Sequence, residues 1–528
     1  MTRTSSFLWL TLVLSLVLSA CGGSSSGGSD PALLGDRVTT ESGDVIGEIV
    51  EDLSIFRGIP YAAPPIGERR WRKPEPFGQF EGAFDAKQFG SACPQFELDA
   101  FVGSEDCLSL NIWAPRAGGS RPVMVFIHGG AYVTGSGSIE LYEASQVARE
   151  GDVVVVTINY RLGPLGFLNS ESLASESGDG SVGNYGIYDQ IAALDWVRQN
   201  IEAFGGDPDN VTVFGESAGS ISICALLGSP LADGLYHRAI LESGGGCWGF
   251  REPRNPAPGY PSMVARGANL LGGLGCVDSE EGLGCARAAS AEDVLRAAPA
   301  EPDGLTNNLM GGMVWGPGVD GHLLLEDPFE RVARGAAPDV PLIIGTNLDE
   351  ATVFTTAIDV NALNYREQIA ASVGEERADA VVALYPIEDW VFAKAAFNVF
   401  ATDLIIACSS EAFAEARSAT GHPTRLYEFR HALRGLLGLV GATHTLELFF
   451  LFGNYFIYTP DAEELALGTA LRTAWTSFAH DGVPELSPAW PTYERGTRSI
   501  SVFDVPTGSA DSWRDGRCEA LRELGLTP

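Results

Sequence analysis

The sequence predicts an α/β fold with a large, mostly parallel central β-sheet flanked by helices, on three observations. Short apolar runs bounded by glycine recur along the chain, as in strands that are buried on both faces. Helical stretches alternate with these runs, and one run ends abruptly at Gly-Glu-Ser-Ala-Gly. The predicted strands are residues 123–128, 153–160, 211–216, 238–243, 341–346 and 424–430.

The helical stretch at residues 184–205 has the clearest pattern. Apolar residues such as Ile191 and Leu194 recur in it every three to four positions, which is typical of one helix face. Glycine and proline become frequent between residues 244 and 320, which indicates an insertion over the sheet. The 528 residues show no internal repeat and no long linker, so we expect one folded domain at residues 37–528.

The composition limits the classes of partner. Apolar residues make up 45% of the chain, which is ample for a globular core. The formal net charge is −34, so the surface repels phosphates and disfavours nucleic acid as a ligand.

The N-terminus predicts export. Residues 1–20 contain one arginine and then an apolar stretch too short to span a membrane, as in a signal peptide. Leu-Ser-Ala-Cys, ending at Cys21, resembles the bacterial lipobox, in which the cysteine receives lipid. Residues 21–36 are rich in glycine and serine, which suits a flexible tether. We expect a lipid-anchored protein of the bacterial envelope, with the outer membrane as a candidate destination; a secreted protein with an incidental cysteine is the alternative.

Export also permits disulfide bonds. The chain has nine cysteines, and eight remain when Cys21 is set aside. Close spacing suggests that Cys93 pairs with Cys107 and Cys276 with Cys285. No C-x-x-C occurs and no His/Cys cluster has the spacing of zinc ligands, so we predict no metal site.

The run VTVFGESAGS at residues 211–220 raises the question of what Ser217 does. Serine is a favoured helix N-cap, so this residue could simply begin the helix expected at residues 217–228. The alternative is a nucleophile on a strand–turn–helix elbow, where Gly215 and Gly219 leave room for close backbone contacts. In that case the positive end of the helix dipole lies beneath the developing negative charge.

A serine nucleophile also needs N–H donors for the oxyanion that forms on its substrate. Ala218, directly after the serine, offers one such donor. The loop 126-FIHGGAYVTGS-136 follows a predicted buried strand and offers others, with Gly130 and Ala131 as the expected donors.

Taken together, these motifs resemble the type B carboxylesterase/lipase family, the cholinesterase-like branch of the α/β-hydrolases. The resemblance extends from about residue 38 to residue 518. The matching stretches are FRGIPYAAPPIGERRWRKPEP (56–76), EDCLSLNIWAP (105–115), FIHGGAYVTGS (126–136), NYRLGPLGFL (159–168), residues 184–220, ILESG (240–244), GTNLDE (345–350) and GATHTLELFFLFG (441–453).

The resemblance implies the α/β-hydrolase fold and a chain order of nucleophile, acid and histidine. Glu350 of G-x-N-x-D-E corresponds to the acid, with Asp349 as the alternative or as a solvated loop charge. His444, in G-A-x-H-x-x-E-L, corresponds to the general base. The histidines late enough in the chain to serve are His422, His431, His444 and His480.

The same comparison implies supporting residues. Glu216, Ser243 and Glu447 correspond to a buried hydrogen-bonded network behind the triad, whose carboxylates should have displaced pKa values. Cys408 would pair with Cys518, which leaves the pairing of Cys224 and Cys247 open. Two ion pairs of a structural kind are also implied, Arg70 with Glu105 and Arg161 with Asp189.

The predicted function is hydrolysis of carboxylic esters through an acyl-enzyme, with a small-molecule substrate and no cofactor. The loop 94–106 lacks the tryptophan that a choline group requires, so choline esters are disfavoured. Trp248, Met313 and Phe354 are candidates for the substrate pocket, with an ordinary core role as the alternative. We expect neutral short-to-medium acyl or aryl esters. The alternatives are a lipase, an amide, carbamate or polyester hydrolase, and a non-catalytic adhesion protein.

Overall fold

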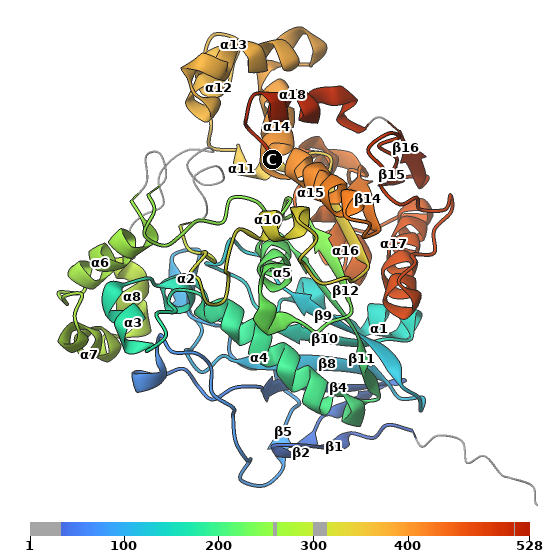
Figure 1. The fold of residues 1–528 in the computed structure, drawn as a ribbon. Helices are drawn as coiled ribbons and strands as arrows, with labels where there is room; N and C mark the ends of the chain where they lie inside the picture. Colours follow the sequence, from blue (N-terminus) through green and yellow to red (C-terminus); the bar gives the residue numbers. More distant parts are fainter. Residues whose placement is uncertain (1–32, 257–260, 299–313, 512) are drawn as a thin grey trace, which may run out of the picture.

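The computed structural model describes residues 33–256, 261–298, 314–511 and 513–528 (Figure 1). Its centre is an 11-stranded sheet, which establishes the predicted α/β class. The signal peptide, Cys21 and Met313 lie outside the described residues. In spatial order the strands are β16 (Gly508–Ala510), β15 (Ile500–Phe503), β14 (Thr424–Phe429), β13 (Leu342–Asn347), β12 (Arg238–Glu242), β11 (Gly206–Glu216), β9 (Arg121–Ile127), β10 (Val154–Ile158), β8 (Ser109–Pro115), β4 (Leu53–Pro60) and β3 (Glu48–Val50).

The middle of this sheet is parallel and its two edges are antiparallel. The strands from β10 through β9 and β11 to β15 pair in parallel, whereas β8, β4, β3 and β16 pair antiparallel. All six predicted strands are present. β11 begins five residues earlier than predicted, because an irregular segment at Gly206–Val211 precedes its regular part.

Helices cover both faces of the sheet, and alternate residues of each strand enter opposite layers. Val125 of β9 lies in the core layer shared with α4 (Tyr185–Asn200) and α5 (Ala218–Gly228). Phe126, the next residue, lies in the layer shared with α16 (Leu446–Phe452) and α17 (Ala462–Asp481). The sheet is therefore buried on both sides, as the continuous apolar runs predict.

A third apolar cluster lies at the top of the molecule as drawn in Figure 1. It is helical, and Cys408–Cys518 ties it to the C-terminal segment. The stretch Ala393–Ala419 within it is apolar enough to cross a membrane, yet 83% of its apolar window is buried in the fold, as in a core helix. Its helices are α12 (Tyr365–Val373), α13 (Glu375–Leu384), α14 (Ala393–Thr402) and α18 (Arg517–Glu523), with α15 (Cys408–Ala419) continuing from α14.

The predicted insertion is a helical excursion between β12 and β13. Its helices α6, α7 and α8 lie beside α2 and α3 at the left of Figure 1. Its two ends meet, because the N–H groups of Gly249 and Phe250 donate to Asp327 Oδ2 at 3.0 and 2.9 Å. The bounds are α2 (Gly163–Phe167), α3 (Glu171–Glu176), α6 (Met263–Gly273), α7 (Glu280–Ala288) and α8 (Ala291–Ala297).

The remaining elements are short. β1 (Arg37–Thr40), β2 (Gly43–Ile46) and β5 (Phe84–Asp85) form a small sheet, and β6 (Gln95–Glu97) pairs with β7 (Ala100–Val102) as a hairpin. The short helices are α1 (Ser145–Gly151), α10 (Pro328–Ala333) and α11 (Ala351–Phe354).

The three predicted disulfides are present, together with a fourth. Cys93–Cys107, Cys276–Cys285 and Cys408–Cys518 form as expected. Cys224 of α5 bonds to Cys247, which settles the pairing that the sequence leaves open. Both implied ion pairs also form, Arg70 with Glu105 at the edge of the core and Arg161 with Asp189 inside it.

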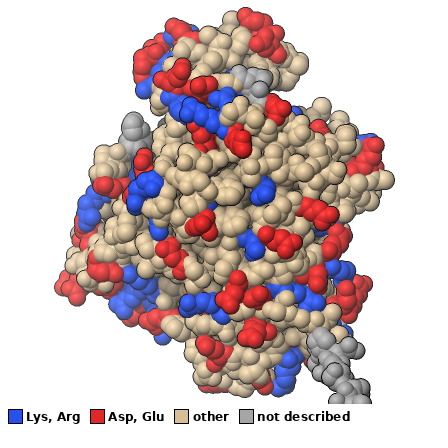
Figure 2. Space-filling model, turned by 45° about the vertical axis from the view of Figure 1, so that its right-hand side comes forward, with Lys and Arg blue, Asp and Glu red and all other residues tan. Residues whose placement is uncertain are grey.

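Acidic and basic side chains are interspersed over the face shown in Figure 2. On that face, lysine and arginine lie next to aspartate and glutamate and do not form one continuous basic stripe. The lack of a basic stripe on this face and the net charge of −34 both disfavour a polyanionic partner.

Candidate active site

Ser217 lies on a sharp turn between β11 and α5. Its backbone has φ 58° and ψ −121°, a conformation that costs energy for any residue with a side chain. It holds the N-cap position, but its hydroxyl makes no capping hydrogen bond. The helix-start interpretation is therefore insufficient, since a capping serine has extended backbone and uses its oxygen on the helix.

Glycine permits this turn to form. A Cβ on Gly219 would lie 1.9 Å from the carbonyl oxygen of Ile127, and one on Gly215 would lie 2.7 Å from the same atom. Any side chain at either position would push α5 away from β9. The predicted need for small residues around Ser217 is thus met by direct backbone contact.

His444 and Glu350 meet near this turn, from loops that follow two other strands. Glu350 follows β13 at its carboxyl end, and His444 lies in the loop before α16. His444 Nδ1 lies 2.6 Å from Glu350 Oε2, and both side chains are nearly or fully buried. The second carboxylate oxygen accepts from Thr346 Oγ1 at 2.9 Å and from the Asn347 N–H at 2.7 Å. Glu350 is thereby held to one orientation.

Asp349, the alternative acid, has a different task. Its Oδ2 accepts the Ala442 N–H at 2.9 Å, and its own N–H donates to the Ala442 carbonyl at 3.0 Å. It therefore fastens the loop of His444 to the loop of Glu350, and is neither a solvated charge nor a partner of the imidazole.

The other late histidines have partners elsewhere. His422 contacts Asp339 at 2.7 Å, His431 contacts Glu464 at 3.0 Å, and His480 contacts the Gly151 carbonyl at 2.9 Å. None of these carboxylates or carbonyls belongs to the neighbourhood of Ser217, so geometry agrees with the choice of His444.

Three backbone N–H groups lie on the two segments that flank Ser217. Gly130 and Ala131 follow β9 with positive φ values of 108° and 53°, and Ala218 begins α5. Within the described part of the chain, none of these three N–H groups has a hydrogen-bond acceptor. Gly129 brings this loop against the nucleophile, since its Cβ would lie 2.9 Å from Ser217 Cβ. The arrangement suits an oxyanion between the loop and the helix end.

The predicted supporting network is also assembled. Ser243 Oγ donates to Glu447 Oε1 at 3.4 Å, and Glu447 Oε2 accepts from the side chain of Asn347. Glu216 Oε1 lies 3.1 Å from His444 Nε2. Despite this short distance, Glu216 Oε1 makes no hydrogen bond with suitable geometry among the described residues, and neither does the Ser217 hydroxyl. Hydrogen bonds between catalytic groups often tighten only when substrate is bound.

The buried carboxylates and the imidazole shift one another's pKa values. Burial raises the pKa of Glu216 to about 8, with His444 opposing the rise. Burial also raises the pKa of Glu447 to about 7, and the charge of Glu350 adds to it. Burial by itself lowers the pKa of His444, but the charges of Glu216 and Glu350 outweigh it and raise that pKa to about 9. A proton on Glu216 removes one of those charges, so the two groups titrate as a pair.

Sequence reasoning missed two members of this cluster. Asn347 lies in the predicted motif at residues 345–350, but its amide also donates to the Thr443 carbonyl at 2.8 Å and so braces the histidine loop. Glu242 is fully buried beside Glu216 in the sheet register, and burial raises its pKa well above the ordinary value. Glu242 comes directly before Ser243 in the motif ILESG, and this position is the sequence signal that could have identified it.

Known proteins share this chain's pattern over nearly its whole length. The pattern of the family described as "Carboxylesterase family" matches residues 35–520. The chain belongs to this carboxylesterase family. The para-nitrobenzyl esterase of Bacillus subtilis (strain 168) is 39% identical over 496 residues, covering 88% of this chain and 94% of that protein. The fumonisin B1 esterase of Sphingopyxis macrogoltabida is 35% identical over 496 residues, covering 89% and 87%.

Solved structures agree with the sequence relatives. A structure titled PNB esterase superposes with a TM-score of 0.80 at 36% identity, covering 92% of this chain and 99% of that one. The fold of this carboxylesterase is thus the α/β-hydrolase fold, and the protein is a carboxylic ester hydrolase.

The candidate pocket residues of the carboxylesterase that the structure describes lie in different surroundings. The Phe354 ring lies 4.8 Å from the His444 ring, centroid to centroid, so it borders the site. Trp248 is 45% exposed and follows the Cys224–Cys247 disulfide, so it is not an ordinary core residue.

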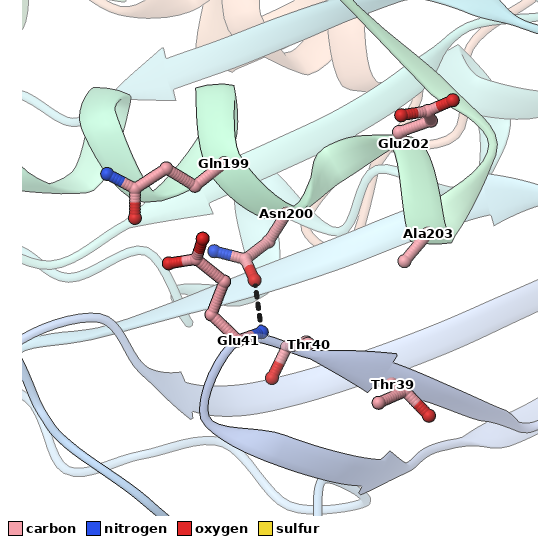
Figure 3. Close-up of a pocket in the computed structure, with 7 residues that line it drawn as sticks. All are labelled: Thr39, Thr40, Glu41, Gln199, Asn200, Glu202 and Ala203. Carbon is pink, nitrogen blue, oxygen red and sulfur yellow. Dashed lines mark hydrogen bonds between the residues drawn. The ribbon is translucent and has the colours of Figure 1, made fainter.

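Two other features of the carboxylesterase lie outside this site. In the described ranges, no cluster of three His, Cys, Asp or Glu side chains could hold a metal ion. A shallow surface depression lies between β1 and the C-terminal end of α4, with Asn200 on its wall (Figure 3). None of its lining residues belongs to the triad, so it has no part in the chemistry described above.

Proposed function

We propose that the protein hydrolyses neutral short-to-medium acyl or aryl esters in two acyl-transfer steps, with Ser217 as nucleophile, His444 as general base and Glu350 as acid. The observation that carries this proposal is the 2.6 Å contact between His444 and Glu350 beside a strained serine elbow. A serine is a weak nucleophile until an oriented base removes its proton, and these residues supply both parts.

In the first step, Ser217 Oγ attacks the ester carbonyl carbon while its proton passes to His444 Nε2. Glu350 accepts the Nδ1–H, which keeps the imidazole in the required tautomer and stabilises its protonated form. The carbonyl electrons move to oxygen, and the N–H groups of Gly130, Ala131 and Ala218 bind that oxyanion. His444 then gives its proton to the departing alcohol.

In the second step, water attacks the acyl-enzyme carbonyl and gives a proton to His444. The tetrahedral intermediate occupies the same N–H groups, and Ser217 leaves with the proton from the imidazole. Both steps close without a cofactor, because the proton that Ser217 gives to the alcohol is replaced by one from water.

Glu216, Ser243 and Glu447 act in this proposal by setting the charge around His444. They make no bond to substrate. A negative Glu216 stabilises the imidazolium, and protonation of that carboxyl weakens the stabilisation. The buried cluster therefore adjusts the pH range in which His444 can serve as a base.

The substrate class follows from the surroundings of the triad. Phe354 offers an apolar wall, and the short hairpin β6–β7 has no tryptophan for a quaternary ammonium group. The acidic net charge disfavours anionic esters. The two relatives are named for para-nitrobenzyl and fumonisin B1 esters, so their names indicate no single substrate.

We also propose the exported lipoprotein form, with a signal peptide at residues 1–20, lipid on Cys21 and a tether at residues 21–36 before the hydrolase domain. The support is the sequence Leu-Ser-Ala-Cys and the Gly/Ser composition that follows. Labelling cells with a fatty-acid analogue should mark the wild-type protein and leave a Cys21→Ser variant unmarked. Label on both proteins, or on neither, contradicts the proposal.

The experiment that tests the catalytic proposal is hydrolysis of 4-nitrophenyl esters from acetate to dodecanoate. Ser217→Ala should lower kcat by about 10⁴–10⁶-fold, because only binding and oxyanion stabilisation remain. Ser220→Ala, which removes a hydroxyl one turn farther along α5, is the matched control and should retain activity. A Ser217→Ala enzyme that still turns over contradicts the proposal.

The same ester series separates a carboxylesterase from a lipase. Activity that falls with chain length supports the proposed substrate class. A jump in activity where the ester exceeds its solubility favours a lipase instead. Parallel assays with the matching anilides and carbamates test the amide and carbamate alternatives.

A further inference from the structure

Gln95 lies where the first disulfide loop contacts the loop that offers the oxyanion donors. It begins β6, two residues after Cys93, and only 1% of its surface is exposed. Gln95 Oε1 accepts from Thr134 Oγ1 at 2.6 Å and from the Gly135 N–H at 2.8 Å. Gln95 Nε2 donates to the Gly135 carbonyl at 2.9 Å and to the Cys93 carbonyl at 3.0 Å. An amide has two accepting and two donating positions, and here all are used.

The residues that Gln95 holds pack against the oxyanion donors. The Gly130 carbonyl accepts from the N–H groups of Val133 and Thr134 at 3.0 and 3.1 Å, which closes a tight turn. A Cβ on Gly130 would lie 2.2 Å from the Thr134 carbonyl oxygen, and one on Gly135 would lie 2.6 Å from the Gly129 carbonyl oxygen. The two arms of the loop therefore touch backbone to backbone, and a shift of one arm moves the other.

We propose that Gln95 is a positioning residue for the oxyanion hole, which fixes the Gly130 and Ala131 N–H groups by clamping the far arm of their loop to the Cys93–Cys107 loop. This inference rests on the proposed function, because the oxyanion hole that Gln95 positions is the one proposed for ester hydrolysis.

The Cys93–Cys107 loop, to which Gln95 fastens the oxyanion loop, is itself held in place. The Cys93–Cys107 disulfide closes its loop, and Asn159 Nδ2 donates to the Cys107 carbonyl at 3.1 Å. Asn159 Oδ1 accepts the Gly137 N–H at 2.8 Å, two residues beyond the contacts of Gln95. Neutral amides thus join the disulfide loop and the oxyanion loop at successive points. Because an unpaired buried polar group is costly, each loop is confined to the arrangement that satisfies these amides.

A clamp of this kind affects the transition state more than the bound ester. The oxyanion needs donors at 2.7–3.1 Å from the position that the charged oxygen occupies, and a misplacement of about 1 Å can cost about 100-fold in rate. The neutral ester carbonyl has no such requirement. Loss of Gln95 should therefore lower kcat and leave KM nearly unchanged.

The test compares Gln95→Met with wild type and with Asn200→Leu. Methionine keeps the length of the side chain and removes all four hydrogen bonds. Asn200 is a matched control, because it is also a buried amide bound to backbone, to the Glu41 N–H at 2.8 Å and the Trp196 carbonyl at 3.0 Å (Figure 3). Three quantities are measured beside Tm: kcat and KM on 4-nitrophenyl butyrate, and Ki for an apolar trifluoromethyl ketone.

The ketone reports on the oxyanion hole directly. Ser217 Oγ adds to its carbonyl carbon, the proton moves to His444, and the carbonyl electrons become an oxyanion in the hole. We expect Gln95→Met to lower kcat by about 10–100-fold, to change KM by less than about threefold and to raise Ki by the same factor as kcat/KM falls. Asn200→Leu should lower Tm without changing kcat or Ki.

Unchanged kcat and Ki in folded Gln95→Met overturn the proposal, and so does an equal loss in Asn200→Leu. If Gln95→Met does not fold, Thr134→Val decides, because it removes only the part-buried hydrogen bond from Thr134 to Gln95. A several-fold loss in kcat supports the proposal, and no loss overturns it. Turnover by Ser217→Ala would instead contradict the proposed function, whatever the Gln95 variants do.

Discussion

The two sides of Ser217 are built from different chemistry. On one side, after β13 and around the start of α16, the side chains of Glu350, His444 and Glu447 are charged or titratable and interact through hydrogen bonds and Coulomb forces. On the other side, after β9, the proposed donors are the backbone N–H groups of Gly130 and Ala131, and the neutral amide of Gln95 braces their loop. The difference separates proton transfer, which depends on pH, from oxyanion binding by backbone donors that do not titrate. His128 lies beside these donors, and burial lowers its pKa to about 4, so it stays neutral above that pH.

This division has a physical reason. A base must gain and lose a proton, so its surroundings must respond to charge. A backbone donor must stay in place while the charge on the substrate appears and disappears, and glycine and amide contacts provide that without titrating. Changes on the charged side should therefore alter pH profiles, whereas changes on the neutral side should alter rates at every pH.

The largest effect after loss of the nucleophile is expected at the acid. Glu350→Gln should lower kcat by about 10³–10⁴-fold, because a neutral amide no longer fixes the tautomer of His444 or stabilises its imidazolium. Asp349→Asn is the matched control, since it keeps the shape of the loop and a weaker acceptor for Ala442. Steady-state kinetics on one ester compare the two; a larger loss in Asp349→Asn would reassign the acid.

On the neutral side, Gly129→Ala should lower kcat by about 100-fold at every pH. The added Cβ would lie 2.8 Å from both the carbonyl oxygen and Oε2 of Glu216 and 2.9 Å from Ser217 Cβ, so the loop must move away from the nucleophile. Gly284→Ala in α7, where the new Cβ meets nothing within 4 Å, is the control. Rates measured across pH separate the outcomes. A loss at every pH supports displaced donors, a shifted profile alone would mean that the methyl acts through Glu216, and wild-type kcat would contradict the prediction.

A smaller change is expected from Glu216→Gln, and it concerns pH. The negative charge of Glu216 raises the pKa of His444, so its removal lowers that pKa. Because the base must be neutral, the acid limb of kcat/KM should move to lower pH, by about one unit. Glu411→Gln, a buried glutamate that accepts from Tyr493 elsewhere, should leave the limb in place. A limb that moves to higher pH would refute the role of Glu216.

The smallest effect should come from the apolar wall. Phe354→Ala should raise KM for aryl esters by about 10-fold and leave kcat within a few-fold, because one face of the binding site becomes open. A fall in kcat with unchanged KM would instead mean that Phe354 orients the His444 ring beside it.

Features with a local signature were predictable from sequence. Buried parallel strands such as β10 appear as unbroken β-branched runs, and the elbow appears as a strand ended by Gly-Glu-Ser-Ala-Gly. His444, Glu350 and the network residues Ser243 and Glu447 were found because each belongs to a motif of the family. The structure brings these side chains together, while their catalytic roles remain predictions that the variants above test.

Features that depend on distant partners were not predictable. The antiparallel strand β8 (SLNIWAP), which pairs with β10 and β4, mixes polar and apolar residues and so lacks the unbroken apolar run of the parallel strands. Cys224 and Cys247 each had other partners available, and only the fold brings α5 to the start of the insertion. Gln95 and Thr134 are 39 positions apart, so no local pattern relates them.

The insertion that joins Gly249 to Asp327 has a consequence for how such enzymes diversify. Because both ends meet at one carboxylate and Cys247 is bonded to α5, the excursion begins and ends at a fixed point of the hydrolase core. Its helices can vary in sequence and length between these two points, provided that side chains such as Leu270 and Leu283 still cover the core of the hydrolase fold. New substrate ranges can therefore arise by replacing one closed segment, while the reaction itself is inherited intact.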